Sequence, residues 1–162
     1  MKKELLICLL AFSLPISQLF SQEKNEGQQL PSVTVTSSTN VTAEVKKAFA
    51  KAFVNAEQLK WYKMDKDFLA KFILDDMEHN AAFKKNGYMK YDVGFGFERN
   101  LPADVLDQVK AKYSKYSVSR VFKVNADNRD IWMMNLDGLK DYVVVRFENG
   151  DIDELDSFRK AK

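Results

Sequence analysis

The stretch that decides the fold covers residues 45–87 and reads VKKAFAKAFVNAEQLKWYKMDKDFLAKFILDDMEHNAAFKKNG. It begins with Val45, Phe49 and Phe53, whose spacing places them on one side of an amphipathic helix. Further along, the apolar residues recur at every second position, which is typical of strands with one buried face. The stretch ends at Asn86-Gly87, which we interpret as the turn of a two-residue hairpin. These features predict a helix followed by antiparallel strands.

The same order of features returns over residues 105–150. Val105 and Val109 lie on the apolar side of a second helix, and Asn149-Gly150 supplies a second hairpin turn. The offset is 60 residues between the helices and 63 residues between the turn glycines. Two divergent copies of one unit, a helix followed by four antiparallel strands, are therefore predicted.

The N-terminal residues 1–21 have the three parts of a secretory signal peptide. Lys2 and Lys3 precede an uncharged apolar run over residues 5–20, and the small Ser21 precedes polar residues. A membrane anchor is the alternative, but the run is short for spanning a bilayer and a proline interrupts it. We expect a mature protein that lies in the periplasm, is secreted, or stays at the cell surface.

Cys8 is the only cysteine, and it follows Ile7, where a lipoprotein signal would need a small residue. We therefore expect Cys8 to leave with the signal peptide. The mature chain then has no thiol, which excludes disulfides, thiolate nucleophiles and zinc-thiolate sites. Removal of residues 1–21 lowers the formal net charge from +2 to +1. A charge this small gives no argument for nucleic acid or for an anionic membrane.

Residues 22–41 are rich in Gln, Ser, Thr and Asn, which predicts a flexible tether. The alternation of Val33 and Val35 with threonines also allows a short edge strand in this segment. The first helix-plus-strand copy is expected over residues 42–100, and the second over residues 101–162.

No set of residues names a reaction. His79 is the only histidine, so one chain can form neither a histidine-based triad nor a multi-histidine metal site. We interpret it as part of an acidic cluster at a hairpin end. The acidic tail could hold calcium, but it lacks the glycine and distal glutamate of a calcium loop, and acids on an edge strand deter aggregation. Its residues are Asp151, Asp153, Glu154 and Asp156.

We therefore predict that the protein is not an enzyme and has no catalytic residue, no metal site and no cofactor. An enzyme built only on carboxylates, such as a glycosidase, is the alternative, because two acids at the right separation would suffice.

Several aromatic and turn positions together resemble a known family. They are Val45 and Phe49 on the first helix, Trp61 on a strand, Phe83 before the Asn-Gly turn, Leu101-Pro102 at the start of the second helix, and Val109 and Tyr113 within it. The order resembles that of the PepSY-like exported proteins of Bacteroidetes, which are built like the beta-lactamase inhibitor protein. The resemblance covers about residues 42–158.

The resemblance implies an α+β fold in which tandem helix-plus-four-strand repeats form one curved antiparallel eight-stranded sheet with two helices on one face. It also implies binding by the opposite, open face of the sheet. The inhibitor protein binds its enzyme on that face, and related PepSY domains are thought to restrain peptidases. Beta-lactamase itself is not carried over as a target.

Residues of like parity within a strand lie on the same face of a sheet. On the face toward the helices we expect a core formed by Val45, Phe49, Phe53, Val105, Val109 and Tyr113 with Trp61, Phe68, Phe72, Phe83, Trp132, Met134, Val143, Val145 and Phe147. Opposite parity places Tyr62, Leu69, Lys71, Ile73, Lys84, Ile131, Met133, Tyr142, Val144 and Arg146 on the open face. Apolar residues interleaved with lysine and arginine indicate an interface with a basic rim.

The sequence thus predicts a non-enzymatic exported protein that binds another exported protein or peptide through its open sheet face. Inhibition of an envelope enzyme is one form that such binding could take. The alternatives are carriage or sensing of a small apolar ligand, self-association of the same face in a homodimer or structural module, and cover by residues 22–40. We expect neither nucleic acid as a partner nor membrane insertion after removal of the signal peptide.

Overall fold

The computed structural model describes residues 35–37 and 40–161, which belong to one unit, Ser32–Lys162. The predicted signal peptide, and the predicted tether up to residue 34, lie outside the described residues. Val41 is already buried in the core, so packing begins one residue before the predicted start of the first copy.

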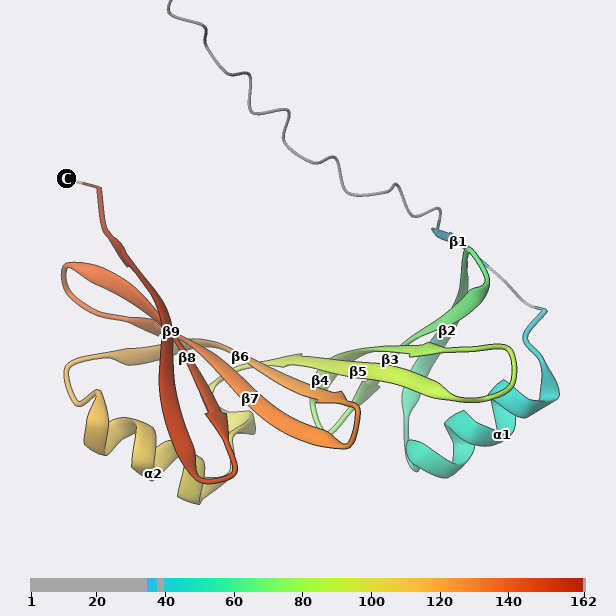
Figure 1. The fold of residues 1–162 in the computed structure, drawn as a ribbon, viewed down its shortest axis with the longest axis horizontal. Helices are drawn as coiled ribbons and strands as arrows, with labels where there is room; N and C mark the ends of the chain where they lie inside the picture. Colours follow the sequence, from blue (N-terminus) through green and yellow to red (C-terminus); the bar gives the residue numbers. More distant parts are fainter. Residues whose placement is uncertain (1–34, 38–39, 162) are drawn as a thin grey trace, which may run out of the picture. The chain divides into compact units, whose positions relative to one another are not determined.

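Two helices of ten residues, α1 (Ala43–Ala52) and α2 (Ala103–Lys112), lie on the same face of the sheet (Figure 1). The hydroxyl of Thr42 caps α1 by accepting a hydrogen bond from the Val45 amide at 3.4 Å. Pro102 occupies the N-cap of α2, where its missing N–H removes no hydrogen bond within the helix. Both helices bury the apolar side that the sequence predicts.

Nine strands form one antiparallel sheet in which each strand pairs with its neighbours in the sequence. They are β1 (Val35–Ser37), β2 (Glu57–Met64), β3 (Asp67–Leu74), β4 (Met77–Phe83), β5 (Met89–Gly96), β6 (Ser117–Ala126), β7 (Arg129–Asp137), β8 (Asp141–Glu148) and β9 (Asp151–Arg159), and a short 3-10 helix, η1 (Glu98–Asn100), precedes α2. The predicted α+β class is confirmed, with eight long strands and two helices on one face. The short β1 adds a ninth strand at the free edge of β2.

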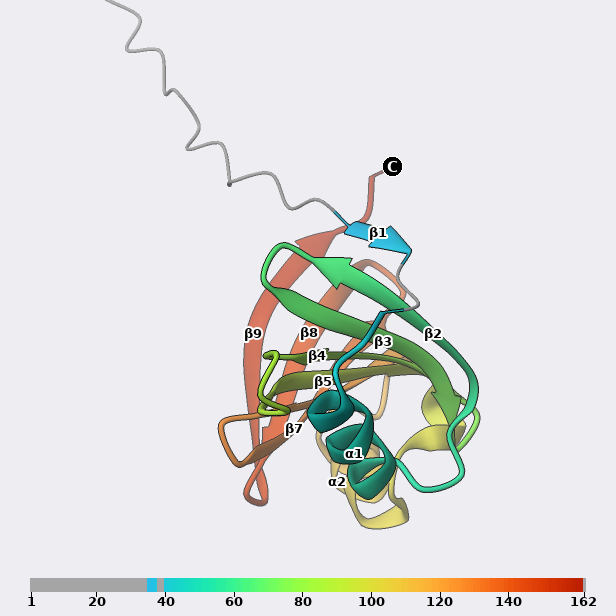
Figure 2. The ribbon, with the colours of Figure 1, turned by 90° about the vertical axis from the view of Figure 1, so that its right-hand side faces the viewer.

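The order of one helix and four strands occurs twice, first as α1 with β2 to β5 and then as α2 with β6 to β9. Figure 2 shows the sheet from its β2 end, with both helices beneath it. That the two halves arose as copies of one sequence stays a prediction.

The turn between β8 and β9 is the two-residue hairpin that Asn149-Gly150 predicts. Both residues have positive φ, 53° for the asparagine and 91° for the glycine, which matches the right-handed twist of the flanking strands. Asp75-Asp76 makes the same kind of turn between β3 and β4, with φ of 51° and 61°. Short Asp and Asn side chains tolerate this conformation, so a turn of this type forms there without glycine.

The predicted two-residue turn at Asn86-Gly87 is wrong in length. A hydrogen bond from the Lys84 amide to the Tyr88 carbonyl closes a three-residue loop over residues 85–87. Gly87 takes a φ of 85° at the last of these positions, and a Cβ there would meet the carbonyl oxygen of Glu44 at 2.8 Å. The loop also packs against the start of α1, where the Thr42 hydroxyl donates a hydrogen bond to the Lys85 carbonyl at 2.9 Å.

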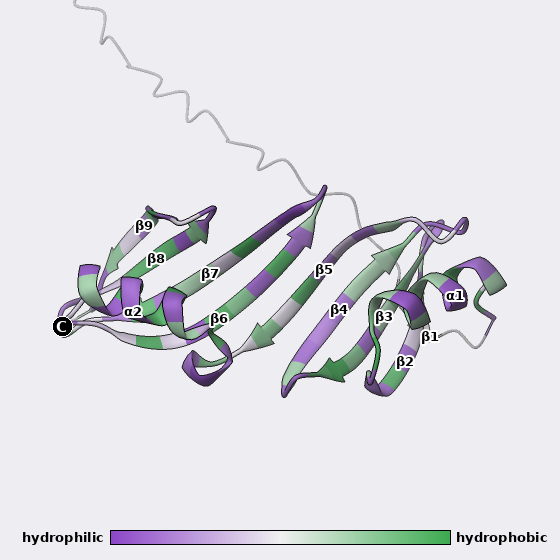
Figure 3. Cartoon of the chain, turned by 90° about the horizontal axis from the view of Figure 1, so that it is seen from below, coloured by the Kyte–Doolittle hydropathy of each residue, from purple (hydrophilic) through white to green (hydrophobic). Residues whose placement is uncertain are grey.

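The helix-facing side of the sheet holds two apolar cores rather than one. The first core packs α1 on β3 and β4, and its buried members are Val41, Val45, Phe49, Phe53, Phe68, Ala70, Phe72, Ala81 and Phe83. The second packs α2 on β6, β7 and β8, and its buried members are Met77, Leu101, Val105, Val109, Val121, Trp132, Met134, Leu136, Val143 and Val145. Every residue expected in the core is buried or packs against a core. Figure 3 shows the underlying alternation as bands of hydrophobic and hydrophilic residues along β6 and β7.

Candidate functional site

The sheet face opposite α1 and α2, here called the open face, carries the residues that strand parity places there. Strand register puts Tyr62 beside Leu69, Lys71 beside Asn80, Ile73 beside Glu78, Ile131 beside Val124, Met133 beside Arg146, and both Tyr142 and Val144 on β8 between β7 and β9. Lys84 follows the last residue of β4 and therefore lies past the end of that strand. Leu69 also belongs to this face by strand parity, but it is only 8% exposed and so lies beneath the surface.

One row of register partners crosses seven strands of the open face, and we call it the central row. It runs Ile73, Glu78, Phe95, Phe122, Met133, Arg146, Asp153. Three predicted residues, Ile73, Met133 and Arg146, therefore share one row, with two phenylalanines in its middle. The row is apolar at its centre and charged at its β9 end.

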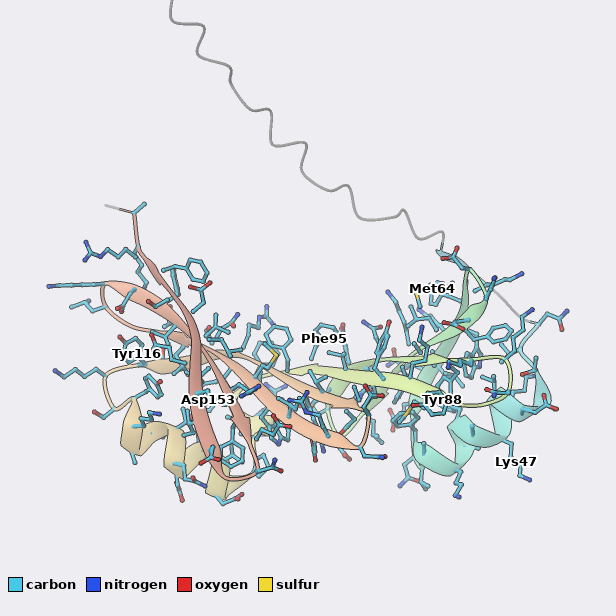
Figure 4. The ribbon with its side chains drawn as sticks, in the orientation of Figure 1. Lys47, Met64, Tyr88, Phe95, Tyr116 and Asp153 are labelled. Atoms are coloured by element: carbon cyan, nitrogen blue, oxygen red, sulfur yellow. The ribbon has the colours of Figure 1, made fainter. Side chains whose placement is uncertain are left out.

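Aromatic side chains stand exposed on and beside the central row. Phe95 contacts Phe122 with ring centroids 5.8 Å apart and planes at 80°, an edge-to-face arrangement. Figure 4 shows Phe95 projecting on the side of the sheet away from the helices, whereas Lys47 projects from the outer side of α1. Phe95, Phe97, Tyr142 and Phe158 remain 39%, 43%, 43% and 53% exposed. Each of these rings keeps part of its apolar area exposed to solvent.

The charged end of the open face is tied together by ion pairs. Arg129 donates two hydrogen bonds of 2.7 Å to the Glu148 carboxylate, and Arg146 donates one of 2.5 Å to Asp153. Arg146 also lies 3.8 Å from Glu148. The hydrogen bonds from Arg129 lower the pKa of the Glu148 carboxyl below its ordinary value, against the opposing effect of burial. The charges of this region therefore largely neutralise one another.

Three other cations of the first half and the centre lie over aromatic rings. Lys71 is 5.4 Å from the ring centroid of Tyr62, and Lys84 is 4.9 Å from that of Tyr88. The Arg120 guanidinium is 4.6 Å from the ring centroid of Phe97. Each pair places a positive charge over the face of an aromatic ring, which attracts the cation.

His79 does not lie where the sequence interpretation placed it. It is a residue of β4, 6% exposed, and not part of an acidic cluster at a hairpin end. Its Nδ1 lies 3.0 and 3.1 Å from the two carboxylate oxygens of Asp92, which is 1% exposed. The ring stacks on Phe72 at 5.1 Å. These are the two buried polar side chains of the described residues, and they lie between the two cores.

Gly94 makes room for this histidine. A Cβ at position 94 would come within 2.8 Å of His79 Cε1 and 3.0 Å of Nε2. A cavity of about 340 Å³ opens beside the pair, and Lys123, Asn125 and Trp132 help to line it. Asn125 donates a hydrogen bond of 3.5 Å to Asp92, and Lys123 lies over the ring of Trp132. These contacts engage three of the polar side chains around the cavity.

Within residues 35–37 and 40–161, no three His, Cys, Asp or Glu side chains gather in a way that could hold a metal ion. In the part of the chain that the structure describes, neither helix is long and apolar enough to cross a membrane.

Sequence reasoning missed four residues of the open face, which are Phe95, Phe97, Arg120 and Phe122. Gly94 and Gly96 made the end of β5 look like a bend, although the alternation of phenylalanine with glycine marks a strand with one large-residue face. On β6, a bulge between Val118 and Arg120 resets the parity, so simple counting from Val118 gives the wrong face.

No protein-family model and no curated protein matches the sequence. Solved structures do match its fold. A BLIP-like protein from Bacteroides fragilis is 19% identical, with a TM-score of 0.57 over 73% of this chain and 89% of that protein. A DUF2874 family protein from Bacteroides ovatus is 16% identical, with a TM-score of 0.55 over 75% of this chain and 89% of that one. A protein provisionally described as periplasmic, from Bacteroides eggerthii, is 16% identical, with a TM-score of 0.52 over 74% and 89% of the two chains. At these identities the likeness shows the fold.

Proposed function

We propose that this chain is a non-enzymatic exported protein that binds another exported protein or peptide through the open face of its sheet. The observation that carries the proposal is the set of exposed aromatic rings on the open face, with Phe95 in the central row and Phe97, Tyr142 and Phe158 outside it. An antiparallel sheet with one solvated face normally presents polar residues there. Large exposed rings beside arginine are instead typical of binding interfaces.

Export is supported by the signal-peptide pattern of residues 1–21 and by the periplasmic description of one structural neighbour. The absence of enzyme activity is supported by the chemistry of the open face, where the acids Glu148 and Asp153 are held by arginines. A carboxylate engaged in this way is poorly suited to act as a general base at neutral pH.

The alternatives find less support. An apolar ligand in the curve of the open face would need a cavity there, whereas the apolar cavity of about 610 Å³ lies between α1 and β2, lined by Phe53, Leu59 and Trp61 among others. Cover of the open face by the tether has less support, because β1 pairs with the edge of β2 and so extends the sheet. Self-association of the open face is an outcome that the experiment below separates.

The test is affinity capture from an envelope extract with the mature protein and with an Ile131→Asp/Tyr142→Ala double variant. Both changes lie on the open face, and Tyr142 is well exposed, so the fold should persist and circular dichroism checks this. A Val54→Asp/Leu139→Ala double variant is the matched control, because Val54 and Leu139 are 66% and 91% exposed and lie outside the strands.

We expect the wild type and the control to capture the same proteins, and the open-face variant to lose them. If the folded open-face variant captures the same set, the open face is not the binding site. Light scattering on the purified protein shows whether a second copy occupies the face: a dimer that the open-face variant dissolves would favour self-association.

A further inference from the structure

The surroundings of Arg120 on the open face differ from those of the other arginines there. Arg129 is held by Glu148, and Arg146 is held by Asp153. Arg120 is exposed, and among the described residues no carboxylate lies within ion-pair distance of its guanidinium. Its guanidinium lies over the ring of Phe97, 4.6 Å from the ring centroid. The open face thus presents one arginine that is positioned by packing but not neutralised.

A guanidinium that lies over an aromatic ring can keep N–H groups free to donate. These groups can donate two parallel hydrogen bonds to a carboxylate, and the side chain over the ring has lost part of its rotamer freedom beforehand. Phe97 is also in contact with Arg99, whose guanidinium is 5.1 Å from the ring centroid and is bonded to Asp76. The Phe97 ring therefore contacts both guanidiniums.

Apolar contact area lies two positions along β6 from Arg120. Phe122 is two residues beyond Arg120 on β6 and shares its face, because Phe122 pairs with Met133 and Arg120 pairs with Asn135. Positions two apart on a strand are separated by about 7 Å. An extended segment lying along β6 would present its own residues i and i+2 at the same spacing.

We propose that Arg120 is the carboxylate-binding position of the open face. It takes an Asp or Glu side chain of the bound protein or peptide, and an apolar side chain two positions away in the same extended segment packs on the Phe95–Phe122 pair. The inference rests on the proposed function and names the chemistry of its partner. Charge complementarity supports it, because the positive charges of Arg129 and Arg146 are already paired with carboxylates of the chain.

The experiment selects binders from a displayed library of random 12-residue peptides on the immobilised mature protein. We expect enrichment of peptides with an acid and an apolar residue at positions i and i+2, in either order. A selected peptide is then made with its acid and with the matching amide, and its affinity is measured by fluorescence anisotropy against the wild type, Arg120→Gln and Arg159→Gln. Arg159 is the matched control, because it is exposed and pairs with Asp141 in register, which places it on the opposite face.

Losing a hydrogen bond between charged groups should weaken the acidic peptide by roughly 10- to 100-fold in Arg120→Gln. The amide peptide should bind the wild type and Arg120→Gln almost equally, and Arg159→Gln should resemble the wild type. Equal binding of the acidic peptide by Arg120→Gln would overturn the assignment of Arg120.

The two proposals fail separately. If Ile131→Asp/Tyr142→Ala loses the peptides but Arg120→Gln keeps them, the open face binds and the role of Arg120 is wrong. If the selected peptides bind all of these folded variants equally, or if no peptide is enriched, both the proposed function and the role of Arg120 are wrong.

Discussion

Replacing His79 by leucine while keeping Asp92 should be among the most damaging single changes in this protein. The variant would leave a carboxylate that is 1% exposed with only the Asn125 amide, 3.5 Å away, as a partner. Removal of one member of a buried charged or hydrogen-bonded pair costs about 3–5 kcal/mol. Asp92→Val leaves the imidazole Nδ1 without a partner, which costs about 1–3 kcal/mol.

The double variant His79→Leu/Asp92→Val should be more stable than these losses predict. It removes both polar groups and replaces them with apolar side chains beside Phe72 and between two apolar cores, and such replacements are often nearly neutral. We therefore expect the double variant to lose less unfolding free energy than the two single variants lose together. The difference should be about 2 kcal/mol or more.

Urea unfolding of the four proteins, followed by far-ultraviolet circular dichroism, measures this coupling. The dependence of the free energy on urea concentration should keep the same slope, since a changed slope would mean a changed unfolded state. Additive losses, or a His79→Leu variant that loses less than about 1 kcal/mol, would refute the view that the pair acts as one buried unit.

Three further predictions concern the core, acid stability and processing. Phe49→Ala removes a 7% exposed ring that packs edge-on against Trp61, with ring centroids 5.3 Å apart. The loss of about 3–5 kcal/mol of unfolding free energy should lower the melting temperature by roughly 10 °C or more. A negligible shift in calorimetry would contradict the assigned core face. Arg129 lowers the pKa of Glu148 in the folded state, so the Glu148 carboxylate stabilises the fold at pH values above the ordinary pKa of glutamate. This stabilisation should be lost as the pH falls below that pKa. The melting temperature of Glu148→Gln should therefore change less with pH over the same interval. An unchanged profile would show that the ion pair adds nothing to acid stability. Intact-mass measurement of exported protein should find a chain that begins near Gln22, and retention of residues 1–20 would rule out the predicted cleavage.

The strand and helix pattern could be read from the sequence because each element carries its own period. Val45 and Phe49 on α1, and Val143 and Val145 on β8, are placed by spacing alone, and their burial confirms the placement. The hairpin turn at Asn149-Gly150 could likewise be predicted from neighbouring residues alone. Such features depend on residues within a few positions of one another.

The candidate site was less accessible, because it depends on register between strands. His79 and Asp92 are 13 positions apart and meet only through the pairing of β4 with β5. Arg120 reaches the open face because a bulge shifts the parity of β6. Bulges and register shifts involve two strands at once, and a single sequence gives no direct signal of either.

The sequential strand order has a consequence for how the chain is made. Both synthesis and export deliver a polypeptide from its N-terminus, and here each new strand pairs with the strand that preceded it in the chain. The buried members of the first core all lie between Val41 and Phe83, so that core can close while the second half is still emerging. No long hydrophobic edge has to wait for a partner encoded far ahead, which shortens the time during which a newly delivered sheet could pair with the wrong chain.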